Sequence, residues 1–479
     1  MFVQLARDSF VRRFEDFGFI MNQATREDRI YDRTGAVFLE HLPRDPEPIE
    51  TLVDALTGIY TDVTRHVLVE DLTSFIQDLE RDRFVVTGPD AATTVRNQPT
   101  FSYRDSPLVL QKTPASLGIA SSGPFLERHF AQHPRLYSMQ IEVTSRCNEK
   151  CLHCYLPAGR GREDVSKGLI LDVLDQLTEM GTLDVTFTGG EPMLNPDLPL
   201  LLERARRNDF SLGLLTNGTL LSDDLVAVLR EVNVALIQIS LYSMVPETHD
   251  RITGVPGSWT RTRAAIARLV AENIRVQINC PVMKENLATF AEVLVFGEEL
   301  GVKVNPDVIL MARTNFSTHN LAHRLTIDEV EVAIEAIIHY DNNYRAALLD
   351  PDPIRKSLDP DLPICGVGTY MMCLAADGEY YPCPGFKFVL GNTRNDSVQH
   401  VWTQSERIRT LRQMKTASYP QCLTCDAWDY CCICLAKNYN ESGGDLLQIP
   451  EHFCRVSHLN KTLAEKWKVS CRHKLTDET

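Results

Sequence analysis

Three cysteines on one short segment constrain this chain of 479 residues more than any other feature. The run Arg-Cys-Asn-Glu-Lys-Cys-Leu-His-Cys-Tyr spaces Cys147, Cys151 and Cys154 as C-x3-C-x2-C. Thiolates are the usual protein ligands of iron–sulfur clusters. Three of them on one loop can hold three irons of a cubane cluster and leave the fourth iron open to an exogenous ligand. Spacing alone also permits a zinc loop or three unrelated core cysteines.

The distribution of the other cysteines favours metal sites over disulfides. The chain has 14 cysteines, with none before Cys147 and nine between Cys365 and Cys454; Cys280 and Cys471 are outliers. In a long chain without an export signal, clustered cysteines are more typical of metal binding than of disulfide frameworks. The sequence therefore predicts one metal site on the first loop and further sites in the C-terminal segment.

Charge and hydropathy exclude several classes of protein. The net charge is -15 without a block of Lys and Arg, which disfavours nucleic-acid binding. The N-terminus has neither the basic start nor the apolar core of a signal peptide. No run of 18 apolar residues could cross a membrane. We therefore expect a cytoplasmic protein of about three domains that binds neither nucleic acid nor membrane.

Residues 1–88 form the first compositional unit. Two strand-like runs, 17–21 and 29–32, flank a charged stretch and predict a hairpin. Helical periodicity follows, and a strand-like run at 84–88 closes the unit; the helical patterns lie around 35–42, 49–59 and 69–81. The next segment, 89–136, is rich in Ser, Thr, Pro and Gly and is expected to be a linker.

Alternating strands and amphipathic helices occupy residues 137–317. The strand candidates are 138–143, 184–188, 212–215, 235–240, 275–279 and 303–310, with helices between them, for example 166–180, 222–231 and 260–272. This alternation predicts an α/β fold with a parallel sheet, here a partial (β/α)6 barrel of the TIM type. The remaining segments are a helical bridge at 318–364, a cysteine-rich domain at 365–460 and a basic tail at 461–479.

Polar motifs stand at the C-terminal ends of the predicted strands, where barrel active sites lie. Thr188-Gly189-Gly190-Glu191-Pro192 follows the second strand, Thr216-Asn217-Gly218 the third and Ser240-Leu241-Tyr242-Ser243 the fourth. Together with the cysteine loop, these motifs resemble the radical S-adenosylmethionine (radical SAM) enzymes. In that family the open iron binds the amino and carboxylate groups of SAM, and one electron from the cluster cleaves SAM to methionine and a 5′-deoxyadenosyl radical.

The resemblance also implies roles for individual residues. Gly189 and Gly190 allow the backbone to approach a ligand closely, and Glu191 accepts a hydrogen bond from the SAM amine. Arg251 is either a partner of the SAM carboxylate or substrate, or part of a surface turn with Asp–Arg pairing. His153 is expected to line the SAM site through its backbone. Four further residues are expected to line it through their side chains: Thr216, Asn217, Ser240 and Asn279.

The C-terminal cysteines resemble the SPASM domain, which carries two auxiliary [4Fe-4S] clusters in peptide-modifying radical SAM enzymes. The pattern is Cys365-x12-Gly378-x4-Cys383, then Cys422-x2-Cys425-x5-Cys431, then Cys434 and Cys454. The resemblance implies that Cys365, Cys383 and Cys434 bind the nearer cluster and that the distal cluster is held by Cys422, Cys425, Cys431 and Cys454. A zinc-ribbon-like fold is the alternative.

Three residues depart from the SPASM pattern. The run Cys431-Cys432-Ile433-Cys434 leaves open whether Cys431 or Cys432 is the distal ligand. Cys373 is either a fourth ligand of the nearer cluster or a core residue of a hairpin that turns at Asp377-Gly378. Pro384 follows Cys383 where sulfatase-maturing relatives place a catalytic Asp, which argues against that activity.

These resemblances predict an oxidoreductase-type enzyme with three [4Fe-4S] clusters and SAM as cofactors. The layout of residues 1–88 resembles the winged-helix peptide-recognition domain of peptide maturases; a small packing or dimerisation module is the alternative. The expected substrate is a ribosomally made peptide, and the expected product carries a Cys thioether cross-link. Carbon–carbon cross-linking is the closest alternative, and a non-catalytic iron–sulfur or zinc scaffold is an alternative of another class. An electron donor such as flavodoxin or ferredoxin is the expected partner.

Overall fold

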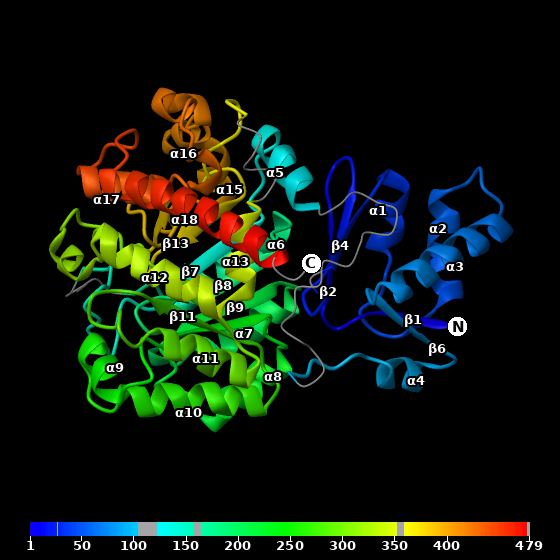
Figure 1. The fold of residues 1–479 in the computed structure, drawn as a ribbon. Helices are drawn as coiled ribbons and strands as arrows, with labels where there is room; N and C mark the ends of the chain where they lie inside the picture. Colours follow the sequence, from blue (N-terminus) through cyan, green and yellow to red (C-terminus); the bar gives the residue numbers. More distant parts are fainter. Residues whose placement is uncertain (26, 104–121, 158–163, 352–358, 477–479) are drawn as a thin grey trace.

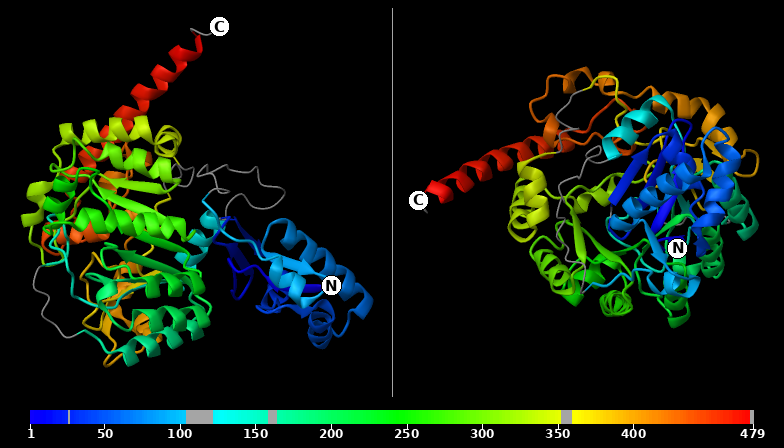
Figure 2. Two further views of the ribbon diagram at one scale, coloured as in Figure 1. Left: turned by 90° about the horizontal axis from the view of Figure 1, so that it is seen from below. Right: turned by 90° about the vertical axis from the view of Figure 1, so that its right-hand side faces the viewer.

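The computed structural model describes residues 1–25, 27–103, 122–157, 164–351 and 359–476 (Figure 1). A small N-terminal lobe lies beside a larger body that contains the barrel and the C-terminal segment (Figure 2). The last helix projects from the body on the side away from the small lobe in one of these views. Within the described residues, no helix is both long and apolar enough to cross a bilayer.

The N-terminal lobe contains two three-stranded sheets with helices packed on them. One sheet has the order β2-β3-β4 and the other β5-β1-β6; their bounds are β1 Phe2–Leu5, β2 Ser9–Arg13, β3 Gly18–Asn22, β4 Glu27–Tyr31, β5 Glu47–Pro48 and β6 Val85–Gly88. The predicted hairpin is confirmed as β3–β4. The three expected helices are α1 Arg33–Glu40, α2 Ile49–Ile59 and α3 Arg65–Arg81. The sequence did not predict β1, whose partner β6 lies about 80 residues away along the chain.

The body is built on a nine-stranded sheet of order β12-β11-β10-β9-β8-β7-β13-β14-β15. The six expected strands pair in parallel, as in a partial barrel: β7 Ser138–Glu142, β8 Asp184–Thr188, β9 Ser211–Thr216, β10 Leu236–Ser240, β11 Val276–Pro281 and β12 Lys303–Asp307. Their connections carry α6 Lys167–Glu179, η1 Pro192–Leu194, α7 Leu198–Arg207, α8 Asp223–Glu231, α9 Pro246–Thr253, α10 Ser258–Ala271 and α11 Ala291–Leu300.

The C-terminal segment extends the barrel sheet. After the bridge of η2 His319–His323, α12 Ile327–Tyr340 and α13 Asn342–Leu349, strand β13 Met371–Leu374 pairs in parallel with β7. The expected hairpin is β13 with β14 Glu379–Tyr381, and Gly378 at its turn has φ +87°. The remaining elements are β15 Gly391–Asn392, α15 Val398–Gln404, α16 Glu406–Arg412, η3 Thr416–Ser418, η4 Pro420–Cys422, η5 Trp428–Tyr430, α17 Leu435–Ser442 and α18 Glu451–Thr476.

Two expected boundaries differ from the structure. The segment expected to be a linker contains α4 Ala91–Arg96 and α5 Ser122–Gln132, and its residues 104–121 lie outside the described part. Helix α5 forms because Leu126 and Phe130 bury against the N-terminal lobe and the barrel. The expected start of the basic tail, residue 461, falls inside α18, since Leu463 and Ala464 continue the buried face of that helix.

The N-terminal lobe docks on the end of the barrel where the strands begin. Arg12 donates hydrogen bonds to the carbonyls of Thr182 and Asp209, which precede β8 and β9. Asp8 forms a buried ion pair with Arg275, which precedes β11, at 3.0 Å. Phe10, Phe14, Phe17 and Phe19 of the lobe form one apolar cluster with Leu183 and α5. The lobe therefore lies at the end of the barrel opposite the loops that follow the strands.

Candidate active site

The first cysteine loop follows β7 and is fixed by backbone hydrogen bonds to neighbouring turns. The N–H groups of Lys150 and Leu152 donate to the carbonyls of Thr253 and Ile252 at the end of α9, at 2.8 and 3.0 Å. Cys151 and Cys154 are half-buried and Cys147 is exposed, and the three thiols lie close enough to interact electrostatically. The structure therefore brings the three predicted ligands together on one ordered loop.

Gly189 and Gly190 are required because the cysteine loop lies directly against them. A Cβ atom on Gly189 would lie 2.3 Å from the Thr144 carbonyl oxygen, and one on Gly190 would lie 2.3 Å from that of Arg146. In addition, the N–H groups of Gly190 and Glu191 donate to these same two carbonyls. The sequence predicted close backbone approach by a ligand, whereas here the approaching backbone is that of the cysteine loop.

Glu191 is a buried carboxylate that connects the second and third strand ends. Its oxygens accept hydrogen bonds from the Thr216 hydroxyl at 2.7 Å, the Asn217 N–H at 2.8 Å and the Met193 N–H at 3.0 Å. Burial nevertheless raises the pKa of Glu191. A carboxylate accepts about four hydrogen bonds, so one acceptor position remains for a further donor.

Asn217 extends this connection to the cysteine loop. Its Nδ2 donates to Oδ1 of Asn148, which lies between Cys147 and Cys151, at 2.8 Å. Nδ2 of Asn148 in turn donates to the Thr219 hydroxyl at 2.8 Å. The Thr-Asn-Gly motif thus holds the cysteine loop in addition to lining the space beside it.

Tyr242 is a site residue that sequence analysis did not identify. Its hydroxyl lies 3.8 Å from Sγ of Cys151, within range for an O–H···S hydrogen bond, and also hydrogen-bonds with Ser240. Its backbone N–H donates to Nδ1 of His249, and the Tyr242 ring lies between the rings of His153 and His249 at centroid distances of 5.1 and 5.3 Å. Its position two residues after Ser240, at a strand end, was the available signal.

The other predicted SAM-site residues occupy different surroundings. Asn279 and Gln238 hydrogen-bond to each other on adjacent strands, at 3.1 Å. Arg251 is exposed and donates to the Glu285 carbonyl. The alternative of Asp–Arg pairing is wrong, because Asp250 instead accepts from the N–H groups of Gly257 and Trp259 and from the Ser258 hydroxyl at the start of α10.

His153 is placed at the inner side of the cysteine loop. Its backbone carbonyl accepts a hydrogen bond from Asn320 at 3.2 Å, and burial lowers the pKa of its ring to about 4. Its ring is therefore neutral at physiological pH.

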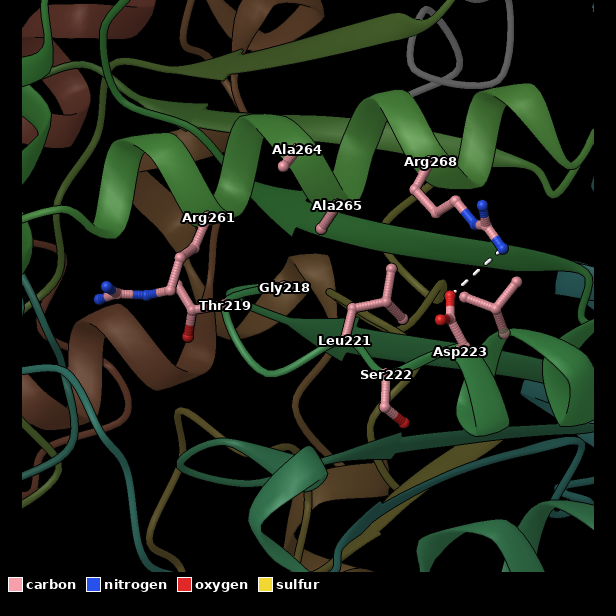
Figure 3. A pocket seen from close by; sticks show the side chains of 10 residues that line it. Gly218, Thr219, Leu221, Ser222, Asp223, Arg261, Ala264, Ala265 and Arg268 are labelled. Carbon is pink, nitrogen blue, oxygen red and sulfur yellow. Dashed lines mark ion pairs between the residues drawn. The ribbon is translucent and has the colours of Figure 1, made fainter.

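A pocket of about 260 Å³ lies behind the Thr-Asn-Gly turn, between α8 and α10 (Figure 3). Gly218 and Thr219 form one wall, and an ion pair of 3.2 Å between Arg268 and Asp223 crosses one end. None of the predicted cluster ligands lines it.

The C-terminal thiols fall into two groups. Cys365 and Cys383 interact electrostatically with each other and with Cys434. Cys422 interacts with three thiols that form the second group with it, namely Cys425, Cys431 and Cys454. Sγ of Cys425 also lies 3.9 Å from Nε2 of His458, and the two residues could hold a metal ion together with Asp426.

Tyr155 lies between the first cysteine loop and the C-terminal cysteines. It is close to Cys154 of the first loop and to Cys383 and Cys373 of the C-terminal segment, and burial raises the pKa of its hydroxyl. Cys373 is fully buried beside Ala375, Tyr381 and Val389. The two metal regions predicted from the sequence are therefore adjacent in space.

The thiol groups fit iron–sulfur clusters chemically. Burial raises the pKa of Cys147 to about 11 and that of Cys422 to about 11. Soft thiolate sets select iron–sulfur clusters, Zn or Cu(I), and a bound metal keeps such thiols deprotonated. The three-thiol loop would hold a cluster with one open iron, whereas the distal group offers four thiols.

Comparison with protein families identifies two domains. The radical SAM superfamily profile matches residues 141–297, and the profile of the SPASM iron–sulfur cluster-binding domain matches residues 365–426. The chain therefore carries a radical SAM domain, and the class of protein is a radical SAM enzyme. More particularly, it is a radical SAM enzyme with a SPASM domain, whose cofactors are SAM and [4Fe-4S] clusters.

Similar proteins include enzymes with different products. The AdoMet-dependent heme synthase of Methanosarcina barkeri is 27% identical, over 66% of this chain and 95% of its own. The PqqA peptide cyclase of Gluconobacter oxydans is 26% identical, over 64% of this chain and 89% of its own. In fold, the chain resembles Streptococcus suis SuiB bound to its precursor peptide SuiA, with a TM-score of 0.61 and 16% identity over 93% of this chain and 100% of SuiB.

Proposed function

We propose that this protein is a maturase that cross-links a ribosomally made peptide, with a Cys thioether as the favoured product. The observation that carries the proposal is the three-thiol loop, held by Glu191 and Asn217 and adjacent through Tyr155 to the C-terminal thiols. When bound, the reduced first cluster and SAM supply a 5′-deoxyadenosyl radical that takes one hydrogen atom from the substrate. Bond formation would then release one proton and one electron, and clusters held by the C-terminal thiols would supply a place for that electron.

The SAM and cluster roles of the individual residues belong to this proposal. Cys147, Cys151 and Cys154 bind the first cluster, and Gly189, Gly190 and Glu191 hold that loop and the SAM amine. Thr216, Asn217, Ser240 and Asn279 line the SAM site, with the backbone of His153, while exposed Arg251 contacts SAM or substrate at the rim. Two auxiliary clusters occupy the two C-terminal thiol groups.

The N-terminal lobe supports a peptide substrate over heme. Two thirds of this chain match the heme synthase over nearly the whole length of that enzyme. The likeness to peptide-bound SuiB, in contrast, spans 93% of this chain. The part of this chain that lies outside the likeness to SuiB is shorter than residues 1–88. The likeness therefore extends into the N-terminal lobe. A lobe with a counterpart in a peptide-bound structure is the expected place for peptide recognition.

Strand β4 is the proposed docking edge for the peptide. β4 pairs with β3 on one side, and no described strand pairs with its other side. Helix α3 lies nearby, because Tyr31 of β4 packs edge-on against Phe75 at 5.0 Å and Arg29 pairs with Asp82. An extended peptide would add as a fourth strand beside β4, with backbone hydrogen bonds providing affinity.

Two measurements test the proposal. Anaerobically reconstituted and reduced protein should convert SAM to 5′-deoxyadenosine; a protein with iron–sulfur clusters that forms none would contradict the radical mechanism. Co-expression with a short cysteine-containing reading frame beside the gene should then yield a peptide that is lighter by two hydrogen atoms per cross-link.

Carbon–carbon cross-linking is the second candidate, favoured by the likeness to PqqA peptide cyclase. It removes the same two hydrogen atoms but consumes no thiol. Alkylation of the product with iodoacetamide separates the two: a thioether leaves one cysteine fewer to alkylate per link, whereas a carbon–carbon link leaves all of them. An electron donor such as flavodoxin or ferredoxin would replace the chemical reductant in the cell.

A further inference from the structure

The segment Cys431–Cys434 joins η5 to α17, and the backbone at its first and last residues is extended. Cys431 has φ −106° and ψ 146°, and Cys434 has φ −123° and ψ 113°. In extended backbone, successive side chains point to opposite sides. The extended backbone at Cys431 therefore directs the side chains of Cys431 and Cys432 to opposite sides of the segment.

The contacts of Cys431 agree with this alternation. Its thiol hydrogen-bonds with Ser457 of α18, and Cys454 lies on the same helix. Its neighbouring thiols are Cys454 and Cys425 of the distal group and that of the adjacent Cys432. Cys431 thus faces the distal site. The sequence left open whether Cys431 or Cys432 is the distal ligand, and this geometry favours Cys431.

The opposite side of the segment faces the nearer thiol group. Sγ of Cys365 accepts a hydrogen bond from the N–H of Leu435, the residue that follows Cys434. Cys432 interacts electrostatically with Cys365 and with Tyr370, five residues along from Cys365. Cys432 is exposed, as is Cys147, a proposed ligand of the first cluster.

We infer that Cys432 is the fourth thiolate ligand of the nearer auxiliary cluster, together with Cys365, Cys383 and Cys434. This inference rests on the proposed function only in taking the C-terminal thiols as iron–sulfur ligands. A cluster with four protein thiolates has no open iron. Such a cluster would therefore have no iron free to bind the thiolate of a substrate.

Cys373 is the rival for the fourth position. It lies in β13, opposite Tyr381 of β14 in the sheet register, and its side chain packs in a small apolar cluster. It is fully buried beside Ala375, Tyr381 and Val389 and lies near Tyr155, whereas the thiols that act on Cys365 are those of Cys434 and Cys432. Cys373→Ala is therefore the matched control for Cys432→Ala.

The test uses the full chain without its first cluster, in the background Cys147→Ala/Cys151→Ala/Cys154→Ala. This parent should hold about eight irons in two cubane clusters. Mild oxidation with ferricyanide removes an iron that has no protein ligand and leaves a three-iron cluster with a distinct electron paramagnetic resonance (EPR) signal. When Cys432→Ala is added to this parent, the protein should lose about one iron per chain on oxidation and gain the three-iron signal. Cys432→Ser replaces it if the alanine variant precipitates. The parent and the Cys373→Ala variant should do neither.

Three results would overturn the inference. The parent could lose one iron by itself, Cys373→Ala could behave as predicted for Cys432→Ala, or the C-terminal cysteines could bind zinc in place of iron. None of these readouts depends on SAM cleavage or on a peptide product. A failure of the peptide cross-linking proposal is thus distinguishable from a failure of the ligand assignment.

Discussion

The two cysteine regions of this protein are organised in different ways. The first three cysteines lie on one loop, and backbone and side-chain hydrogen bonds from the second, third and fourth β/α units hold it. The C-terminal thiols come from separate segments, namely a turn before β13, the end of the β13–β14 hairpin, the η4–α17 region and α18. The spacing along the chain therefore defines the first site, whereas in the second site the direction of each side chain decides which thiols meet.

Removing one cysteine from each region separates their contributions and has the largest expected effect. Cys147→Ala should lose about four irons per chain and should abolish formation of 5′-deoxyadenosine. Cys434→Ala should still form 5′-deoxyadenosine, because Cys434 belongs to the C-terminal thiols and not to the loop proposed to bind SAM. It should give no cross-linked peptide. Iron analysis, chromatography of the nucleoside and peptide mass spectrometry measure these outcomes. Equal loss of 5′-deoxyadenosine in both variants would show that the two regions act as one site.

Gly190→Ala tests whether backbone contacts define the first site. The added Cβ would lie 2.3 Å from the Arg146 carbonyl oxygen, and a backbone atom cannot rotate away. Forced overpacking typically costs about 1–3 kcal/mol, and here it displaces the loop, so the variant should reconstitute with fewer irons and bind SAM weakly. Gly58→Ala is the control: nothing lies within 4 Å of its Cβ position in helix α2, and it should stabilise the lobe by about 0.4–1 kcal/mol. A Gly190→Ala protein with full iron content would refute this role of the turn.

Tyr242→Phe has the smallest expected effect and acts on the properties of the first cluster without removing it. Loss of the O–H···S contact to Cys151 leaves more negative charge on the thiolate, so the midpoint potential should become more negative while the iron content is retained. A redox titration followed by EPR measures this change. Tyr103→Phe removes a comparable hydrogen bond, to the carbonyl of Ile274 at the far end of the barrel, and should leave the potential unchanged. If both variants keep the original potential, the Tyr242 contact does not tune the cluster.

Much of the barrel could be predicted because its signals are local. The six strands and the β3–β4 hairpin follow from short runs of apolar residues bounded by turns. Strand β1 and helix α5 could not be predicted in this way. β1 is defined by pairing with the distant β6, and the apolar residues of α5 are buried by a surface that the N-terminal lobe and the barrel form together.

The site shows the same division between local and distant signals. The motifs at Gly189, Thr216 and Ser240 were visible because each follows a strand directly. Tyr242 was overlooked because its contact with Cys151 joins the first and fourth β/α units, and no spacing rule connects them. Similarly, the opposite directions of Cys431 and Cys432 depend on an extended backbone that the spacing of cysteines does not specify.

If the peptide docks on β4 as proposed, the position of the N-terminal lobe at the start of the barrel strands limits which peptides could be processed. A strand of five residues, such as β10, spans about 16 Å at 3.3 Å per residue. A bound peptide would have to cover at least that length, and the loops at both ends, to bring its reactive residue from the lobe to the cysteine loop. A precursor therefore needs a spacer of more than about five extended residues between the part that is held and the part that reacts. On this proposal, a precursor with a shorter spacer would bind to the lobe without reaching the cysteine loop.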